Sequence, residues 1–357
     1  MTSIDTMNTL RPSFRLVLLT AIFVIRHSSF VIAQGPLTPP GAPAPTMKTL
    51  DQLEARTPIA SAPFTISTPG SYYLTANLTV TSGNAVAITA DHVTLDLNGF
   101  AISSTASPAS GAGVIVNGNG RNITIHNGHI RGTTTFAAGT FTTGGFQDGI
   151  TDNGVNSANV RVVEVDVSGV ANEGIDLADT VSTRIVEHCN VDVSGGLGIR
   201  AGKVRDCAVR NAGAFGVFAD SVTQTTAESV STNTLHNGIA ATLVESSRGV
   251  AGPGDGITAT TVSLCQGVSN AGNGIRATHV ADSSGTSTFS NGILASSALN
   301  CFGASTGGVG IQAFPGTVTF CRGSRDGGLA INCGTAIGCS VAGTGVLSAT
   351  NRFLGSP

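Results

Sequence analysis

Residues 256–293 read GITATTVSLCQGVSNAGNGIRATHVADSSGTSTFSNGI, which is two consecutive copies of one 18-residue unit and the start of a third. Each copy opens on Gly-Ile and contains short runs rich in β-branched residues, separated by Gly, Ser and Asn. The same Gly followed by Ile or Val recurs from residue 149 onward at intervals of 18 to 25 residues, and Ala330 continues the series after Gly149, Gly174, Gly198, Gly216, Gly238, Gly256, Gly274, Gly292 and Gly310.

Other positions repeat in phase with this glycine. Three residues after it stands a small residue in most units, such as Ala259 or Ala277. Twelve residues before it we expect one column of mostly β-branched residues, including Val204 and Thr226, and nine before it a column of Cys and Ser, including Ser229. A period of this length made of short β segments and Gly turns is typical of a solenoid, in which each coil buries its apolar face only by stacking on its neighbours.

The repeat predicts an all-β fold, a right-handed parallel β-helix of about a dozen coils of 18–25 residues, with a short N-terminal capping helix. Units of 18 residues would also fit the hexapeptides of a left-handed β-helix. Coils of 22 and 25 residues do not divide by six, so we favour the right-handed form.

The segments before and after the repeat differ in composition. Residues 1–33 resemble a secretory signal peptide, because Arg11 and Arg15 precede a short apolar run and small residues precede Gln34. An uncleaved membrane anchor is the alternative, although the run is shorter than a bilayer span. We expect a Pro-rich linker at 34–46, a short capping helix or segment at 47–62, the β-helix at 63–345 and a C-terminal cap or tail at 346–357.

Composition excludes several classes of function. Only 18 of 357 residues are Lys or Arg and the net charge is −3, so we expect no nucleic-acid partner, which would need clustered positive charge. A mean hydropathy of +0.24 argues against disorder. The apolar run near the N-terminus is too short to predict an integral membrane span. The sequence leaves the oligomeric state open.

The stretches HVTLDLNGFAI (92–102) and NITIHNGHIRG (122–132), followed by the Gly-Ile units, resemble bacterial secreted right-handed parallel β-helix proteins of the pectate-lyase-like superfamily. The resemblance covers about residues 64–345. It implies a secreted or cell-envelope protein, with a polysaccharide or cell-surface glycan as partner. It does not imply one activity, because that superfamily includes lyases, hydrolases, epimerases, tailspikes and adhesins. The NTD, DD, GHG, RIK and RxPxxR motifs of its sugar-cleaving members are missing from this sequence.

Seven cysteines in an exported chain raise the question of disulfides. Most of them share the column that also holds Ser, which favours small buried thiols that fill one internal position. Disulfides remain an alternative for three pairs: Cys189/Cys207, Cys301/Cys321 and Cys333/Cys339.

One polar column is the candidate site. Counted back ten residues from the repeating glycine, Glu164, His188, Asp206 and Glu228 fall on four successive coils. Glu187 and Arg205 share the next column, and Asp176 is expected to stack near Arg200. Carboxylates stacked about 5 Å apart would repel one another unless a cation lay between them. The resemblance implies that Glu164, Asp206 and Glu228 could hold Ca²⁺, with Arg205 and His188 as catalytic groups. A solvated ladder of paired charges is the simpler alternative.

Two hypotheses about function follow. The first is a non-enzymatic exported β-helix that serves as a cell-surface or envelope scaffold or binds glycans, because the coils from Gly238 to Gly328 are nearly free of charge. The second is a polysaccharide lyase or glycoside hydrolase that acts on uronate-containing polysaccharide through the acidic coils at 149–210. Scarcity of Trp and Tyr argues against the second, because sugar rings stack on aromatic faces.

Overall fold

A computed structural model describes residues 55–118, 120–154, 157–178 and 183–353. They belong to the second of two compact units of the chain, Glu54–Pro357. The predicted signal peptide, the Pro-rich linker and residues 47–54 of the predicted capping helix or segment lie outside the described residues, while residues 55–62 are described and contain no helix.

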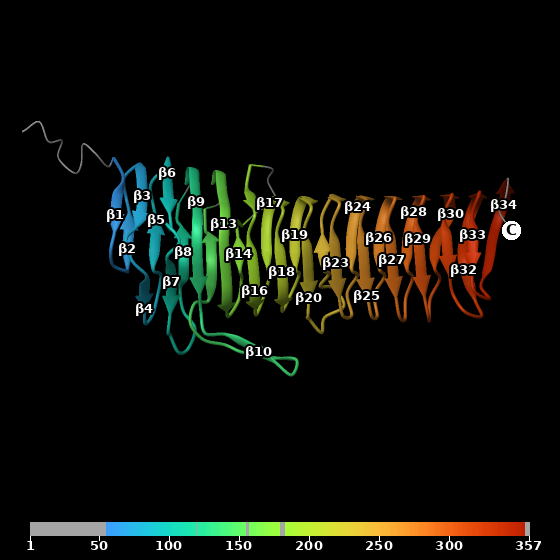
Figure 1. The fold of residues 1–357 in the computed structure, drawn as a ribbon, viewed down its shortest axis with the longest axis horizontal. Helices are drawn as coiled ribbons and strands as arrows, with labels where there is room; N and C mark the ends of the chain where they lie inside the picture. Colours follow the sequence, from blue (N-terminus) through green and yellow to red (C-terminus); the bar gives the residue numbers. More distant parts are fainter. Residues whose placement is uncertain (1–54, 119, 155–156, 179–182, 354–357) are drawn as a thin grey trace, which may run out of the picture. The chain divides into compact units, whose positions relative to one another are not determined.

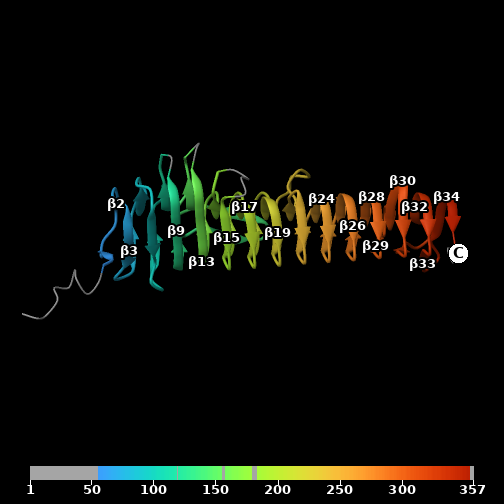
Figure 2. The same ribbon diagram turned by 90° about the horizontal axis from the view of Figure 1, so that it is seen from above.

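The described residues fold as an all-β parallel β-helix, as the repeat predicts. Thirty-two strands form one continuous hydrogen-bonded sheet that winds around the core, and every pairing within it is parallel. Figures 1 and 2 show the coils following one another in sequence order from β1 to β34. Within the described ranges the structure contains strands and turns but no helix.

Each regular coil contributes to three faces of the β-helix. Face A, which carries the Gly-Ile repeat, is formed by β2 (Phe64–Ile66), β5 (Val86–Ile88), β8 (Ala112–Val116), β12 (Asp148–Asp152), β14 (Ile175–Asp176) and β21 (Ile239–Ala240). Face B includes β1 (Thr57–Ile59), β3 (Gly70–Leu74), β6 (Val93–Asp96), β15 (Ile185–Glu187) and β22 (Leu243–Glu245). Strands that run through faces A and B are β17 (Ile199–Arg205), β19 (Val217–Thr223), β24 (Ile257–Ser263), β26 (Ile275–Ala281), β28 (Ile293–Leu299), β30 (Ile311–Thr319), β32 (Leu329–Ile337) and β34 (Val346–Phe353).

Face C follows a corner after face B. Two long strands, β9 (Arg121–Arg131) and β13 (Ala158–Val170), run through faces B and C. The other strands of face C are β4 (Leu78–Val80), β7 (Ala101–Ser104), β16 (Asn190–Ser194), β18 (Ala208–Ala212), β20 (Thr226–Ser229), β23 (Arg248–Ala251), β25 (Gln266–Ser269), β27 (Ser284–Ser287), β29 (Phe302–Ser305), β31 (Arg322–Ser324) and β33 (Ser340–Ala342).

The residue after the repeating glycine forms an unbroken internal ladder. It is fully buried in every unit, and each member pairs in register with the next, from Ile150 and Ile175 through Ile257 and Ile275 to Ile331. The glycine itself is required by packing. A Cβ on Gly198 would lie 2.3 Å from the Val209 side chain and 2.4 Å from a backbone oxygen of the next coil.

The predicted register is wrong in one coil. Val204 pairs with Val222, which pairs in turn with Val244, so Thr226 does not belong to this column. Likewise the backbone N–H of Cys207 donates a hydrogen bond to Thr225 Oγ1. Thr225, and not Ser229 as predicted, therefore follows Cys207 in the column of Cys and Ser. The coil from Gly216 to Gly238 has four extra residues, and they lie after face C. Counting backward from Gly238 across that insertion therefore shifted every column by four.

The ends of the β-helix differ slightly from the expected boundaries. Its first strand, β1, begins at Thr57, inside the segment expected to form a cap at 47–62. At the other end β34 pairs with β32 as far as Phe353, so the coils continue into the predicted C-terminal tail.

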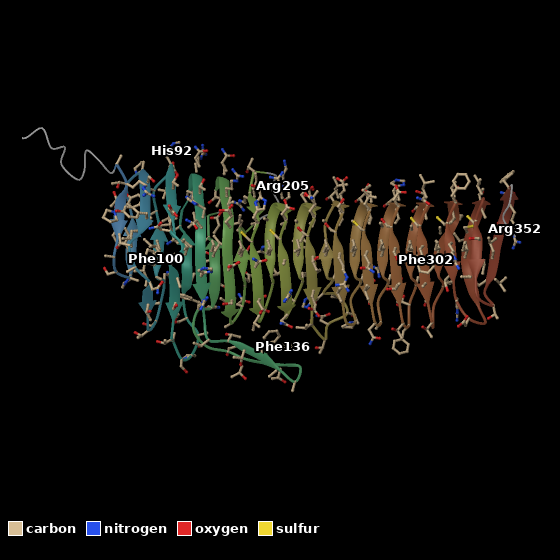
Figure 3. The ribbon with its side chains drawn as sticks, viewed as in Figure 1. His92, Phe100, Phe136, Arg205, Phe302 and Arg352 are labelled. Atoms are coloured by element: carbon tan, nitrogen blue, oxygen red, sulfur yellow. The ribbon has the colours of Figure 1, made fainter. Side chains whose placement is uncertain are left out.

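A two-stranded hairpin leaves the coil after β9. It consists of β10 (Thr135–Ala137) and β11 (Thr140–Thr142), in which the rings of Phe136 and Phe141 lie 4.6 Å apart. Figure 1 shows the hairpin running along one edge of the later coils, and Figure 3 shows Phe136 on the edge opposite to Arg205. Phe141 packs so closely over Gly213 that a Cβ there would lie 3.1 Å from its ring.

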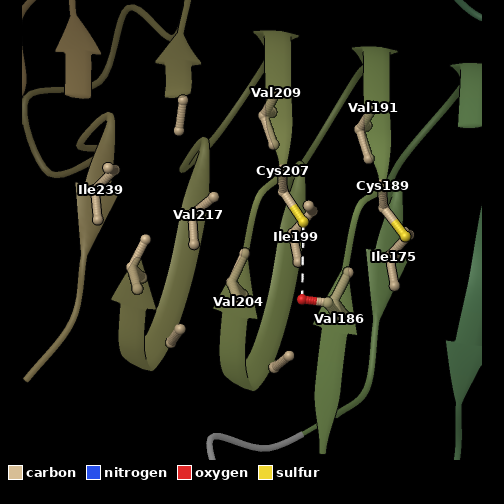
Figure 4. Close-up of a cluster of buried hydrophobic side chains, with 14 of the residues drawn as sticks. Ile175, Val186, Cys189, Val191, Ile199, Val204, Cys207, Val209, Val217 and Ile239 are labelled. Atoms are coloured by element: carbon tan, nitrogen blue, oxygen red, sulfur yellow. Dashed lines mark hydrogen bonds between the residues drawn. The ribbon is translucent and has the colours of Figure 1, made fainter. Parts of the chain in front are cut away.

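All seven cysteines are buried and none forms a disulfide. Figure 4 shows Cys189 and Cys207 among the valines of adjacent coils, and the Cys207 thiol lies 3.7 Å from the Val186 carbonyl oxygen. Thr225, Ser247 and Ser283 continue the same stack through side-chain contacts with neighbouring backbone N–H groups. The thiols therefore fill an internal position that a hydroxyl also fits.

Candidate functional site

The column singled out in the sequence is the corner between faces B and C. Glu164, His188 and Asp206 all have φ between 51° and 55°, in the left-handed region. Short polar side chains and Gly tolerate this conformation better than bulky ones. The polar character of the column therefore has a backbone cause, because each coil turns there through a single left-handed residue.

Glu228 does not lie in this column. Gln224, with φ of 50°, follows Asp206 at the corner, and Glu228 lies on face C in register with Val250. The four-residue insertion in that coil explains the displacement. Glu164, Asp206 and Glu228 are thus not brought together as a set of ligands, and among the described residues no group of three His, Cys, Asp or Glu side chains is placed to hold a metal ion.

Arg205 and His188 belong to a network of ion pairs at the corner. His188 Nε2 lies 3.5 Å from Asp206 Oδ2, and Arg205 Nε lies 3.8 Å from the same oxygen. Arg205 also pairs with Glu187, whose other oxygen accepts a hydrogen bond of 3.0 Å from Arg161 Nε. The in-register pairing of Glu187 with Arg205 agrees with the predicted columns.

Glu187 is the centre of that network. Burial alone would raise the pKa of its carboxyl, but the hydrogen bond and charge of Arg161 and the charge of Arg205 outweigh burial and leave the pKa lowered. Both guanidinium groups are thereby paired with Glu187, and Arg205 is also paired with Asp206. This arrangement is that of a structural charge ladder between coils.

A second group of charged residues lies on face A. We call Asp148, Glu173, Asp176 and Arg200 the acid–arginine cluster. Asp176 and Arg200 pair in register on adjacent coils, as the sequence analysis expects, and Arg200 Nε donates a hydrogen bond of 2.6 Å to Asp176 Oδ1. Asp148 Oδ1 accepts hydrogen bonds of 3.1 Å from the backbone N–H of Glu173 and from Asn172 Nδ2.

Two carboxyl groups in this cluster have opposite pKa shifts. Burial, followed by the hydrogen bond and negative charge of Asp176, raises the pKa of Glu173 to about 8. Burial would also raise the pKa of Asp176. Hydrogen bonds from Glu173, from Arg200 and from the Ala178 N–H outweigh burial and leave the pKa of Asp176 lowered. At neutral pH Glu173 is therefore a protonated acid beside an ionised carboxylate, which is the division of roles that acid–base chemistry uses.

Behind the cluster lies a buried ion pair. Asp152 and Arg184 are 1% and 2% exposed, and Arg184 Nη2 lies 3.7 Å from Asp152 Oδ2. Asp152 Oδ1 accepts hydrogen bonds from the Gly154 N–H and the Ser157 hydroxyl, while Arg184 donates to the carbonyl oxygen of Leu177 at 2.6 Å. Asp152 Oδ2 and Arg184 Nε have no hydrogen-bond partner.

These residues line one cleft. Its volume is about 330 Å³, and its walls include Asp152, Asp176, Arg184 and Arg200. Burial raises the pKa of Asp152, against hydrogen bonds from Gly154 and Ser157 and the charge of Arg184. The cleft therefore offers hydrogen-bond acceptors and donors side by side, in surroundings where burial strengthens each interaction.

An aromatic surface adjoins the cluster on the next coil. Phe218 is in register with Arg200 and 38% exposed, and its ring lies 5.6 Å from that of Phe215. The imidazole of His236 lies 5.2 Å from Phe215. We call Phe215, Phe218 and His236 the aromatic shelf. Face A thus carries charged groups and an apolar platform on neighbouring coils.

A larger groove of about 960 Å³ follows the corner between faces B and C in the C-terminal half. Its walls include Phe302, which is 38% exposed, and Phe320, which is 63% exposed. Asp282, in the same groove, accepts a hydrogen bond of 2.6 Å from Asn300. The groove is long and open, and the paired carboxylates of face A have no counterpart among its walls.

The repeat in the sequence predicts part of this site. It paired Asp176 with Arg200 because both follow the repeating Gly-Ile by one residue. It gave no role to Glu173, which lies in the turn before face A, or to Phe215 and Phe218, which fall in different columns. Asp152 pairs in register with the buried Val116. A charged residue at this inward-facing position was the feature of the sequence that could have revealed the cleft.

Comparison with known proteins gives one structural likeness. No family model and no curated protein matches the sequence. The A-module of the mannuronan C-5 epimerase AlgE6 of Azotobacter vinelandii is similar in structure, with a TM-score of 0.36 and 11% sequence identity over 84% of this chain and 89% of that chain.

Proposed function

We propose that this chain is an exported β-helix protein that binds glycans, and that the glycan lies along face A across the acid–arginine cluster and the aromatic shelf. The supporting observation is the register of Arg200 with Phe218, which places a charged hydrogen-bonding group and an exposed ring on adjacent coils. Sugars present an apolar C–H face and a rim of hydroxyl groups, so a ring beside fixed polar groups suits them.

The stacked coils supply a stiff support for such a site. Adjacent coils repeat at about 4.8 Å, so the positions from Thr151 to Arg276 on face A extend over roughly 29 Å. The backbone of each coil is held by its neighbours, and the side chains on this face are consequently fixed relative to one another. A rigid row of this kind favours binding of an extended polymer, because little ordering entropy is lost.

Export is part of the proposal. It depends on the signal-like residues 1–33, which lie outside the described residues. The described part of the chain contains no helix with the length and apolarity that crossing a membrane requires. A secreted or cell-envelope location would bring face A into contact with polysaccharide, and fractionation of cells that make the full chain would test it.

Binding can be tested with two phenylalanines of equal exposure. Phe218 and Phe302 are both 38% exposed, but only Phe218 lies on face A. We expect Phe218→Ala to weaken binding to soluble polysaccharides in affinity electrophoresis by about fivefold or more, since one aromatic contact contributes about 1 kcal/mol. Phe302→Ala should bind like the unchanged protein. Equal effects of the two substitutions would refute the assignment to face A.

The second candidate function is cleavage of a polysaccharide. The sequence predicts that this polysaccharide contains uronate. The pairing of Glu173 with Asp176 favours it, because a protonated acid beside a carboxylate is a general acid–base pair. Incubation with polysaccharides and measurement of new reducing ends and of unsaturated products would test it. Activity that is retained in Glu173→Gln would exclude Glu173 as the acid.

A further inference from the structure

We propose that the glycan bound at face A is neutral and rich in hydroxyl groups, and that the cleft formed by Asp152, Asp176, Arg184 and Arg200 grips a pair of its neighbouring hydroxyls. This inference rests on the proposed function and names its ligand class. It departs from the uronate expected from the sequence, and the reason is the charge balance of the face.

Each arginine along this stretch of face A has its own carboxylate. Arg200 is held by Asp176, Arg276 Nε lies 2.9 Å from Asp255 Oδ2, and Arg184 faces Asp152. A guanidinium that is already paired has little charge to offer a ligand carboxylate. Asp148 adds a carboxylate on the same side and the protonated Glu173 adds no positive charge, so a polyanion would meet repulsion rather than attraction.

Two polar atoms in the side chains that line the cleft nevertheless lack partners. Asp152 Oδ2 is an acceptor and Arg184 Nε is a donor; both are closed to solvent in side chains more than nine-tenths buried, so a ligand hydroxyl reaches them only when the cleft wall moves. A buried polar atom without a hydrogen bond costs about 1–3 kcal/mol, so a ligand that completes both bonds gains that free energy.

Hydroxyl groups fit this unusual pair of atoms. A hydroxyl donates one hydrogen bond and accepts others, so one sugar hydroxyl can donate to Asp152 Oδ2 while its neighbour accepts from Arg184 Nε. A uronate carboxylate can accept hydrogen bonds but cannot donate one to Asp152 Oδ2. It would also place a third negative charge beside Asp152 and Asp176. The aromatic shelf adds a surface for the apolar face of an uncharged ring.

The test uses matched polymers that differ in charge alone. The probes are polygalacturonate, alginate and hyaluronate, each compared with the neutral polymer made by reducing its carboxylates to primary alcohols. We expect calorimetry to show at least one neutral form binding tenfold or more tightly than its uronate parent, with an affinity that changes little between low and high salt, because screening affects charged ligands most.

A substitution links that preference to the cleft. Asp152→Asn keeps the size of the side chain and an oxygen for Gly154 and Ser157, but it can replace the acceptor Oδ2 by a donor. We expect it to weaken binding of the neutral polymer about tenfold, measured well below a melting temperature that falls because Arg184 loses its buried counter-ion. If the variant unfolds, the comparison of matched polymers decides alone.

The outcomes separate this inference from the proposed function. Tighter binding of the uronate parents, weakened by Phe218→Ala, would overturn the neutral ligand and leave glycan binding in place. Failure to bind any of the six polymers would overturn both.

Discussion

The carboxyl group of Glu173 is hydrogen-bonded to the carboxylate of Asp176, on the same side of the β-helix as Arg200. One proton is therefore held between two acids, in a position where burial opposes ionisation of both. The pair marks the part of face A in which charge is most concentrated, and its protonation has a measurable consequence for stability.

Replacing Glu173 should change how stability depends on pH. Its pKa is raised from an ordinary 4.5 to about 8, so between these values the folded chain binds one proton more than the unfolded chain. Stability contributed by this group is complete below the lower value and is lost as the pH rises through the upper one. Glu173→Gln, which keeps a hydrogen-bond donor, lacks the titrating group, so its melting temperature should not show the fall that the unchanged protein shows between these two pH values. Thermal melts from pH 4 to 9 that show parallel curves for both proteins would contradict this.

The internal ladders predict a sharp difference between two neighbouring positions of β24. Val262 is fully buried and Thr260 is exposed. Val262→Asp places a charge in the core and should cost several kcal/mol, whereas Thr260→Asp should change stability by less than about 0.5 kcal/mol. Chemical denaturation of both variants measures the difference. Similar midpoints for the two would show that the inward register of face B is misassigned.

The cysteines should behave as protected, reduced thiols. All seven are buried. Burial, helped by the charge of Cys339, raises the pKa of Cys333 to about 11, whereas hydrogen bonds with Cys189 and Cys321 lower the pKa of Cys207 and of Cys301, so burial of the sulfur atoms is what protects the set. We expect denatured protein to titrate with seven fast-reacting thiols and native protein to react far more slowly. Mass mapping that found Cys189 joined to Cys207, or Cys301 to Cys321, would replace the thiol ladder by disulfides.

Two corner positions carry side chains that suit them poorly. Leu264 and Phe320 have φ of 54° and 50°, and both are largely exposed. A left-handed conformation costs a residue of this kind about 1–2 kcal/mol, and Asn tolerates it better. Leu264→Asn should therefore stabilise the protein by about 1 kcal/mol. The control is Leu299→Asn, at an exposed position that does not have a positive φ. A loss of stability in both variants would refute the strain argument.

Prediction from the sequence succeeded where one coil resembles the next. The positions of Ile150 through Ile331 and the pairing of Asp176 with Arg200 follow from the phase of the repeat. It failed at Glu228, because an insertion of four residues between Gly216 and Gly238 can lie anywhere in the coil. The pairings of Val204 with Val222 on face B and of Val209 with Ala227 on face C show that it follows face C.

The sequence by itself determined the class of fold and the inward ladders, because identical small and β-branched residues at a fixed period can be buried only by stacking. It also placed the charged coils. Tertiary structure decided which charges meet: Glu173 approaches Asp176 from a turn, and Arg184 reaches Asp152 from the following coil. Turns and insertions follow no period, so their side chains are located by the backbone of neighbouring coils and not by the repeat. For that reason the corner column proved to be a turn, and the cleft of face A became visible only in three dimensions.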